Sequence, residues 1–167
     1  MDLGLKGKRV IITGGSRGMG RAIGEIFLRE GAVVSFCSRT ANMAPEDEDP
    51  RLGGEVHTDG VEQAEEKMRA LGEVYGSVVD AADREQLAAW GKHAAETMGG
   101  IDVVVSNTSA LGSQPRTPEG WQRQFDVDIM SAVTLWDNAY PFLKQSGAGA
   151  FIQVSTITAL DYHAYGK

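Results

Sequence analysis

The sequence has little cysteine and an excess of negative over positive charge. Its single cysteine, Cys37, excludes an internal disulfide and is typical of a protein from a reducing compartment. Sixteen lysines and arginines stand against 23 aspartates and glutamates, which gives a formal net charge of −7. Nucleic acids and anionic membranes are bound by clustered basic charge, so this balance argues against both as partners.

Long apolar runs and metal-ligand spacings are also absent from the sequence. No stretch approaches the roughly 20 apolar residues of a membrane span, and the first residues, MDLGLKGKR, lack the apolar run of a signal peptide. We therefore expect a cytoplasmic protein. Three histidines, His57, His93 and His163, are scattered without metal-ligand spacing, so we expect no metal site.

What the sequence does have is a regular alternation of strand and helix patterns. β-Branched runs predict buried parallel strands over 9–13, 32–37, 74–79, 101–106 and 150–156. Helical spacing of apolar residues predicts a first helix that ends at Gly31 and later helices over 61–71, 83–98 and 121–144. Asp83 is the predicted N-cap of the helix over 83–98. This alternation predicts an α/β fold, a Rossmann-type doubly wound parallel sheet with the strand order 3-2-1-4-5.

A glycine-rich turn follows the first predicted strand and opens the first helix. Its three spaced glycines, Gly14, Gly18 and Gly20, allow a tight turn and a close approach of a phosphate to the backbone. Ser16, Arg17 and Met19 lie within the same turn, next to helix N–H groups that favour anions. We therefore interpret residues 1–167 as a single dinucleotide-binding domain.

Residues 40–60 interrupt the alternation. They are polar and acidic, contain proline, and exceed the length of an ordinary loop between strand and helix. The favoured interpretation is a solvated surface insertion, and the alternative is a lid over the adenine end of a cofactor.

The end of the second strand predicts which dinucleotide binds. A carboxylate at this position would accept hydrogen bonds from the ribose 2′-hydroxyl of NAD, but the sequence has Ser38, followed by Arg39 and Thr40. A guanidinium from Arg39 or from Arg17 can bind the 2′-phosphate of NADP through paired hydrogen bonds. The predicted cofactor is therefore NADP.

The glycine turn and its successors resemble the short-chain dehydrogenase/reductase family. TGGSRGMG is similar to the TGxxxGxG turn of the family's short-form branch, and FDVDIM and VSTITA correspond to later family motifs. The resemblance implies that Asp80, after the third strand, lies against the adenine ring. It places Asn107 in the family's NNAG motif and makes it a cofactor-site residue. It also implies an oxidoreductase that acts on a small-molecule carbonyl or alcohol, and a homodimer or homotetramer.

The resemblance also indicates catalytic positions. The family's serine corresponds to Thr156, with Ser155 just before it, and a threonine hydroxyl can make the same hydrogen bonds. The family's asparagine corresponds to Asp128, a carboxylate that cannot donate as an amide does.

The family's tyrosine and the lysine four residues after it are expected beyond Lys167. The residue four before Lys167 is His163, and the tyrosine should trail the serine by twelve or thirteen residues. We therefore expect the 167-residue polypeptide alone to be inactive and to be the front part of a longer domain. The alternative to an enzyme is a catalytically degenerate NADP-binding protein that acts as a sensor or scaffold, an interpretation that Asp128 and Thr156 favour.

Overall fold

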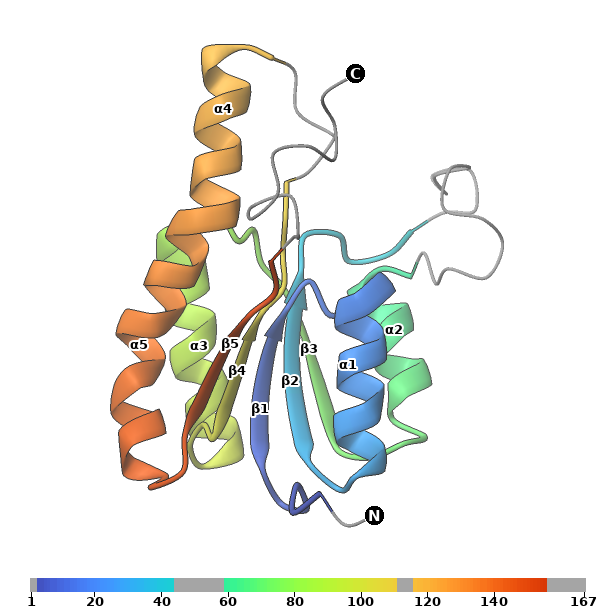
Figure 1. The fold of residues 1–167 in the computed structure, drawn as a ribbon. Coiled ribbons are helices and arrows are strands. Elements are labelled where there is room, and N and C mark those ends of the chain that lie inside the picture. Colours follow the sequence, from blue (N-terminus) through green and yellow to red (C-terminus); the bar gives the residue numbers. More distant parts are fainter. Residues whose placement is uncertain (1–2, 44–58, 111–115, 156–167) are drawn as a thin grey trace, which may run out of the picture.

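Five parallel strands form the centre of the computed structural model, which describes residues 3–43, 59–110 and 116–155. The strands are β1 (Arg9–Thr13), β2 (Val33–Ser38), β3 (Val74–Val78), β4 (Val103–Ser106) and β5 (Ala150–Gln153). They lie in the order β3-β2-β1-β4-β5, and every neighbouring pair is parallel (Figure 1). The predicted Rossmann-type sheet and its strand order are therefore confirmed.

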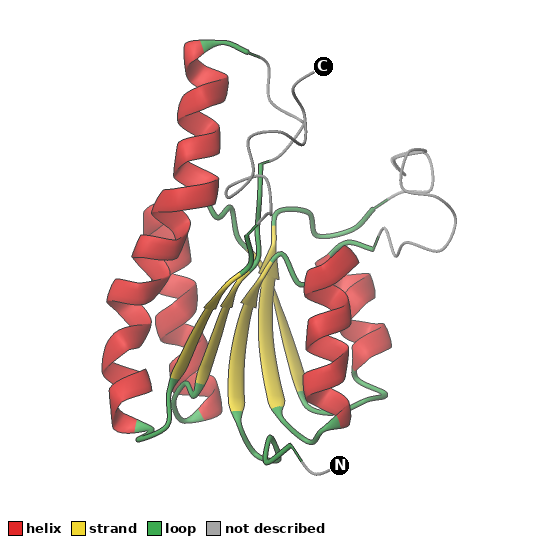
Figure 2. Cartoon of the chain, viewed as in Figure 1, coloured by secondary structure: helices red, strands yellow, loops and turns green. Residues whose placement is uncertain are grey.

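Helices cover both faces of the sheet (Figure 2). On one side lie α1 (Gly18–Arg29) and α2 (Val61–Met68), and on the other lie α3 (Arg84–Met98) and α5 (Ser131–Gln145). A hydrophobic core lies on each face of the sheet. In β1, Val10 and Ile12 pack in the core under α1 and α2, and Ile11 packs in the core under α3 and α5, because successive strand residues point to opposite faces. None of the described helices is long and apolar enough to span a membrane.

The start of α3 follows the predicted capping pattern. The Asp83 carboxylate accepts hydrogen bonds from the backbone N–H groups of Glu85 and Gln86, at 3.1 and 3.0 Å. The helix ends at Gly99, whose φ of 74° lies in the left-handed region that glycine adopts readily. Local chemistry thus fixes both ends of α3.

The long helix predicted over 121–144 begins earlier and is not uniform. It starts as α4 (Pro118–Phe125), because Thr117 caps the helix and proline suits its first position. A π-helical turn, η3 (Asp126–Met130), then joins α4 to α5. The predicted start was wrong by three residues, and apolar spacing alone gave no sign of the π-helical turn.

Both ends of the 40–60 insertion are attached to α2. The side-chain oxygen of Gln63 accepts hydrogen bonds from the N–H groups of Met43 and Gly60, both at 2.9 Å. Its amide nitrogen donates to the carbonyl of Met43 at 3.1 Å. The two predicted alternatives, surface insertion and lid, concern 44–58, which lie outside the described residues.

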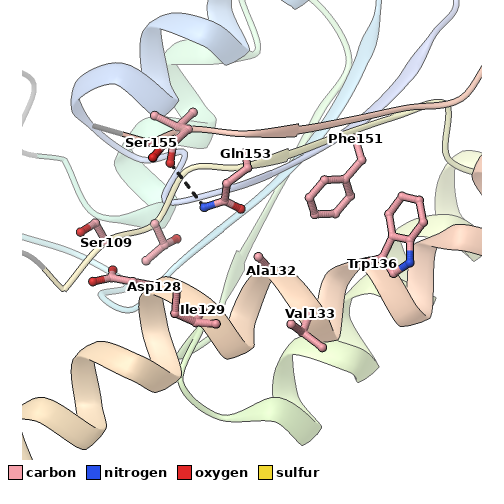
Figure 3. Close-up of a pocket in the computed structure, with 11 residues that line it drawn as sticks. Ser109, Asp128, Ile129, Ala132, Val133, Trp136, Phe151, Gln153 and Ser155 are labelled. Carbon is pink, nitrogen blue, oxygen red and sulfur yellow. Dashed lines mark hydrogen bonds between the residues drawn. The ribbon is translucent and has the colours of Figure 1, made fainter. Parts of the chain in front are cut away.

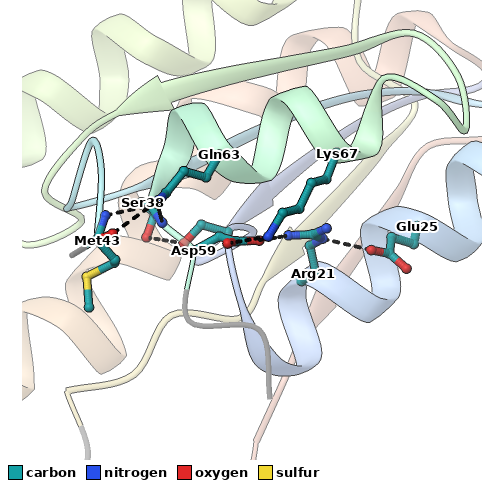
Figure 4. A network of polar contacts seen from close by, with 9 residues as sticks. Arg21, Glu25, Ser38, Met43, Asp59, Gln63 and Lys67 are labelled. Carbon is teal, nitrogen blue, oxygen red and sulfur yellow. Dashed lines mark hydrogen bonds and ion pairs between the residues drawn. The ribbon is translucent and has the colours of Figure 1, made fainter. Parts of the chain in front are cut away.

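A buried arginine holds the returning end of the insertion against α1. The Arg21 side chain is 4% exposed and pairs with Glu25 at 2.7 Å and with Asp59 at 2.8 Å (Figure 4). Lys67 of α2 also binds Asp59, at 2.7 Å. Burial alone would raise the pKa of Asp59, but hydrogen bonds from Lys67 and Arg21 lower it overall. The contact therefore joins α1, α2 and the end of the insertion.

Candidate cofactor site and neighbouring cleft

The glycine-rich turn between β1 and α1 has the backbone that its sequence predicts. Gly18 has a φ of 55°, and a β-carbon there would meet open space. Gly20 is different, because a β-carbon on it would overlap the carbonyl oxygen of Gly14. No side chain caps the N-terminus of α1 at Arg17, so the first N–H groups of the helix have no side-chain acceptor there. This arrangement suits an anionic ligand.

Asn107, which the sequence assigned to cofactor binding, supports the turn from β4. Its amide nitrogen donates to the carbonyl oxygens of Thr13 and Gly14, at 3.0 and 3.3 Å. Its backbone N–H donates to the Thr13 hydroxyl at 3.0 Å. Asn107 thus holds the turn in place, a role that the sequence motif did not specify.

A cavity of about 160 Å³ lies beside the turn, at the carboxyl ends of the strands. Its lining residues are Gly14, Arg17, Cys37, Ser38, Arg39, Val79, Ala81, Thr108 and Ser109. The structure therefore brings four of the predicted cofactor residues around one cavity. Ser16 is buried, and its hydroxyl donates to the hydroxyl of the lining residue Ser38 at 3.0 Å.

Seven predicted cofactor residues do not line this cavity. Four of them, Ser16, Gly18, Gly20 and Asn107, belong to the glycine turn or support it. The other three are Met19, Thr40 and Asp80. Met19 is 65% exposed on the first turn of α1. The carbonyl of Thr40 accepts a hydrogen bond from the N–H of Val61, the first residue of α2, at 2.9 Å. Asp80 lies between the lining residues Val79 and Ala81, and its carboxylate binds Arg123 and the N–H of Ala82.

The charge around the cavity favours an anion. Among the described residues, no carboxylate lines it, and the guanidinium groups of Arg17 and Arg39 form no hydrogen bond or ion pair. Cys37 contributes a neutral thiol, because burial raises its pKa to about 12. Burial alone would raise the pKa of Asp80, but hydrogen bonds from Ala82 and Arg123 and the charge of Arg39 lower it overall.

A second, larger cleft of about 610 Å³ opens between β5 and α5. Its lining residues are Thr108, Ser109, Asp128, Ile129, Ala132, Val133, Trp136, Phe151, Gln153, Val154 and Ser155. Figure 3 shows Phe151 and Gln153 of β5 across the cleft from Ala132, Val133 and Trp136 of α5. Thr108 and Ser109 line both the cleft and the smaller cavity, so the two spaces share a wall.

Asp128 lies in the cleft, in the π-helical turn η3. Its carboxylate accepts a hydrogen bond from the backbone N–H of Ala110 at 2.9 Å. π-Helical turns inside longer helices are frequent at functional sites. The sequence-predicted catalytic position thus faces the same space as the end of β5.

The chain after β5 brings Ser155 to the cleft. Phe151 and Gln153 of β5 line it from alternate positions of the strand, and Val154 and Ser155, which follow the end of β5, line it as well. Thr156, the predicted counterpart of the family's serine, lies outside the described residues.

A Tyr-x-x-x-Lys spacing that sequence reasoning missed lies on α5. Tyr140 and Lys144 are near the carboxyl end of this helix, about 18 Å along its axis from Asp128 at 1.5 Å per residue. The Tyr140 ring packs on Trp136 with centroids 5.2 Å apart. The pair is therefore at the opposite edge of the sheet from the glycine turn, and spacing alone does not make it a site. Among the described residues, no group of histidine, cysteine or acidic side chains could hold a metal.

Sequence comparison places these features among known proteins. The family model described as short chain dehydrogenase matches residues 51–166. Isoepoxydon dehydrogenase patN of Penicillium expansum is 34% identical over 99% of this chain and 61% of its own length. Hydroxysteroid dehydrogenase-like protein 2 of Bos taurus is 32% identical over 90% of this chain and 35% of its own length. The chain therefore spans less than two thirds of these curated relatives.

Solved structures show the same fold. A short chain dehydrogenase from Burkholderia cenocepacia in complex with NADP matches with a TM-score of 0.77 and 21% identity, over 98% of this chain and 60% of its own. The NADH-dependent reductase A1-R′ complexed with NAD matches with a TM-score of 0.74 and 27% identity, over 95% of this chain and 64% of its own. Because the family model covers most of the sequence, this chain belongs to the short-chain dehydrogenase family.

Proposed function

We propose that the whole protein is an NADP(H)-dependent oxidoreductase that moves a hydride between the nicotinamide and a small-molecule carbonyl or alcohol. The observation that carries this proposal is the wall of Thr108 and Ser109, which the cofactor cavity and the larger cleft share. A dinucleotide with its pyrophosphate at the glycine turn would extend along this wall, with its nicotinamide end beside the cleft. The relatives named as dehydrogenases support the same reaction type.

The preference for NADP over NAD rests on charge. Arg17 and Arg39 line the cavity without a carboxylate among its described lining residues, so a 2′-phosphate would meet cations and no acidic group. Solved relatives with bound cofactor include one with NADP and one with NAD, so family membership alone leaves the choice open.

The larger cleft suits a substrate that is mainly apolar. Its walls carry Phe151, Val133 and Trp136, and its polar groups gather at the end near Asp128 and Ser155. Bound NADPH would supply the hydride to the carbonyl carbon, and the carbonyl oxygen would take a proton that comes ultimately from water, which gives the alcohol and NADP⁺. In this arrangement Ser155 or its neighbour Thr156 would orient the oxygen by a hydrogen bond.

A non-catalytic NADP-binding sensor or scaffold is the second candidate. Asp128 favours it, because its carboxylate is held by the Ala110 N–H and cannot donate as an asparagine amide does. The cofactor cavity is compatible with both candidates.

Deuteride transfer separates the two candidates. The whole protein is incubated with NADPH carrying deuterium at nicotinamide C4 and with a panel of apolar ketones and aldehydes, and the alcohol products are examined by mass spectrometry. Deuterium in a product supports the oxidoreductase. Tight NADPH binding without transfer to any carbonyl supports the sensor or scaffold, and absence of NADPH binding contradicts both.

We also propose that the chain self-associates through the outer face of α4 and α5. Trp121 and Phe125 of α4 and Tyr140 of α5 are 64%, 51% and 47% exposed, and large exposed apolar groups are typical of interaction surfaces. Light scattering after gel filtration should therefore give the mass of a dimer or tetramer, and the mass of a single chain would contradict the proposal.

A further inference from the structure

An ion pair joins helix α4 to the rim of the cofactor cavity. The Nη2 atom of Arg123 lies 2.8 and 2.7 Å from the two carboxylate oxygens of Asp80, although the residues are 43 apart in sequence. Their side chains are 29% and 34% exposed. A pair with this much solvent contact adds little to folding stability. Its place at the rim of the cofactor cavity points instead to a role in ligand binding.

The orientation of the Asp80 carboxylate is fixed from two sides. Its Oδ1 atom accepts hydrogen bonds from the backbone N–H of Ala82, at 3.0 Å, and from Arg123. Its Oδ2 atom accepts only from Arg123 among the described residues. A carboxylate oxygen can accept two hydrogen bonds, so Oδ2 keeps acceptor capacity toward a ligand.

The family resemblance implies that the adenine end of a dinucleotide reaches Asp80, and the strand order agrees with it. The glycine turn follows β1 and would hold the pyrophosphate, and Ser38, the last residue of β2, and Arg39 after it would lie beside the adjoining ribose. The next strand in the sheet is β3, so the base would lie at its carboxyl end, against Val79 and Ala81. Asp80 stands between those two residues.

We propose that Arg123 is a positioning residue that holds the Asp80 carboxylate to accept a hydrogen bond from the exocyclic amine of the cofactor's adenine. This inference rests on the proposed NADP-binding function. A fixed carboxylate selects an aminopurine over a ketopurine, because the keto oxygen offers no proton and repels the negative charge. Without Arg123, the side chain of Asp80 can rotate, and the selection weakens.

The test compares NADPH with its hypoxanthine analogue, which has a keto oxygen in place of the adenine amine. Dissociation constants for both are measured by titration calorimetry on the wild type and on Arg123→Leu, Arg123→Lys and Asp80→Asn. The wild type should bind NADPH about ten-fold more tightly than the analogue, the size expected for a hydrogen bond to a charged group. Arg123→Leu and Asp80→Asn should reduce the ratio to about two-fold or less, and Arg123→Lys should recover most of it.

Arg116→Leu is the matched control. It removes a neighbouring exposed arginine that precedes the same helix, and it should leave the ratio unchanged. Thermal unfolding of every variant shows whether it is folded, and if Arg123→Leu fails to fold, Arg123→Lys and Asp80→Asn still measure the ratio.

The experiment distinguishes a failure of the proposed function from a failure of the inference about Arg123. A wild type that binds neither nucleotide overturns the proposed function, and this inference with it. A wild type that binds both equally, or an Arg123→Leu variant that keeps the wild-type ratio, overturns this inference alone and leaves NADP binding intact.

Discussion

At the residue scale, Arg39 should decide between the two nicotinamide cofactors. It lines the cavity at the end of β2, where a ribose 2′-phosphate would lie. Arg39→Asp replaces an attractive charge with a repulsive one, so it should weaken NADPH binding by about 1.5–3 kcal/mol and spare NADH. Titration calorimetry with both cofactors checks this expectation, and equal affinity of the wild type for the two would contradict it.

The end of β5 allows a second test on single residues. Thr156→Ala should lower turnover by about 10²–10⁴-fold with little change in NADPH affinity, because it removes a hydroxyl that would act on the substrate. Thr156→Ser keeps that hydroxyl and should remain active.

Ser155→Ala is the comparison variant for Thr156→Ala. Family alignment favours Thr156, whereas in the structure Ser155 lines the cleft. Steady-state kinetics in which Ser155→Ala is inactive and Thr156→Ala is near wild type would move the catalytic hydroxyl to Ser155. No effect of either change would favour the sensor or scaffold.

At the element scale, the packing of α1 against the glycine turn depends on Gly20. A β-carbon there would overlap the Gly14 carbonyl and the Asn107 amide, so Gly20→Ala should cost about 1–3 kcal/mol and weaken NADPH binding. Urea unfolding and calorimetry measure the two effects.

Gly91 provides the matched control for Gly20. It is a buried glycine inside α3 where an added β-carbon would meet nothing within 4 Å. Gly91→Ala should therefore stabilise the protein by up to about 1 kcal/mol through helix propensity. A similar loss of stability in both variants would contradict the packing argument.

The elements that sequence predicted best depend on local chemistry. The β-branched run of β1, the glycine turn and the Asp83 cap are each specified by a few adjacent residues, and all three are found in the structure. The contacts that sequence missed join distant residues, such as Asn107 with Thr13, which are 94 apart. Such pairs depend on the packed sheet and leave no periodic signal, and the same holds for the pairing of Arg123.

At the scale of the whole molecule, the amino ends of β1 and β4 are joined by a charged pair. Arg9 donates from Nε and Nη2 to the two oxygens of Asp102, at 2.7 and 2.9 Å, and the Asp102 side chain is 8% exposed. The hydrogen bond from Arg9 holds the pKa of Asp102 below its ordinary value of 3.8 despite burial. This pair should stabilise the fold at neutral pH.

The stability from Asp102 should be lost in acid. Because the pKa of Asp102 is lowered in the folded state, its contribution is complete above the ordinary pKa and disappears as the pH falls through the lower, folded value. Asp102→Asn should cost about 1–3 kcal/mol at pH 7 and reduce the loss of unfolding free energy between pH 5 and pH 2. Urea titrations across this range measure both, and Arg9→Leu should reduce the acid loss in the same way. A variant with the wild-type pH dependence would contradict the assignment.

Gln63 holds both ends of the 40–60 insertion. Because Met43 and Gly60 bind the same side-chain oxygen, the chain between them leaves and returns at one point of the scaffold. Doubling the length of a loop that is closed in this way costs only about 0.6 kcal/mol of chain entropy. Evolution can therefore lengthen, shorten or replace this stretch while β2 and α2 keep their positions, and the same point of the scaffold is suited to grafting a foreign peptide.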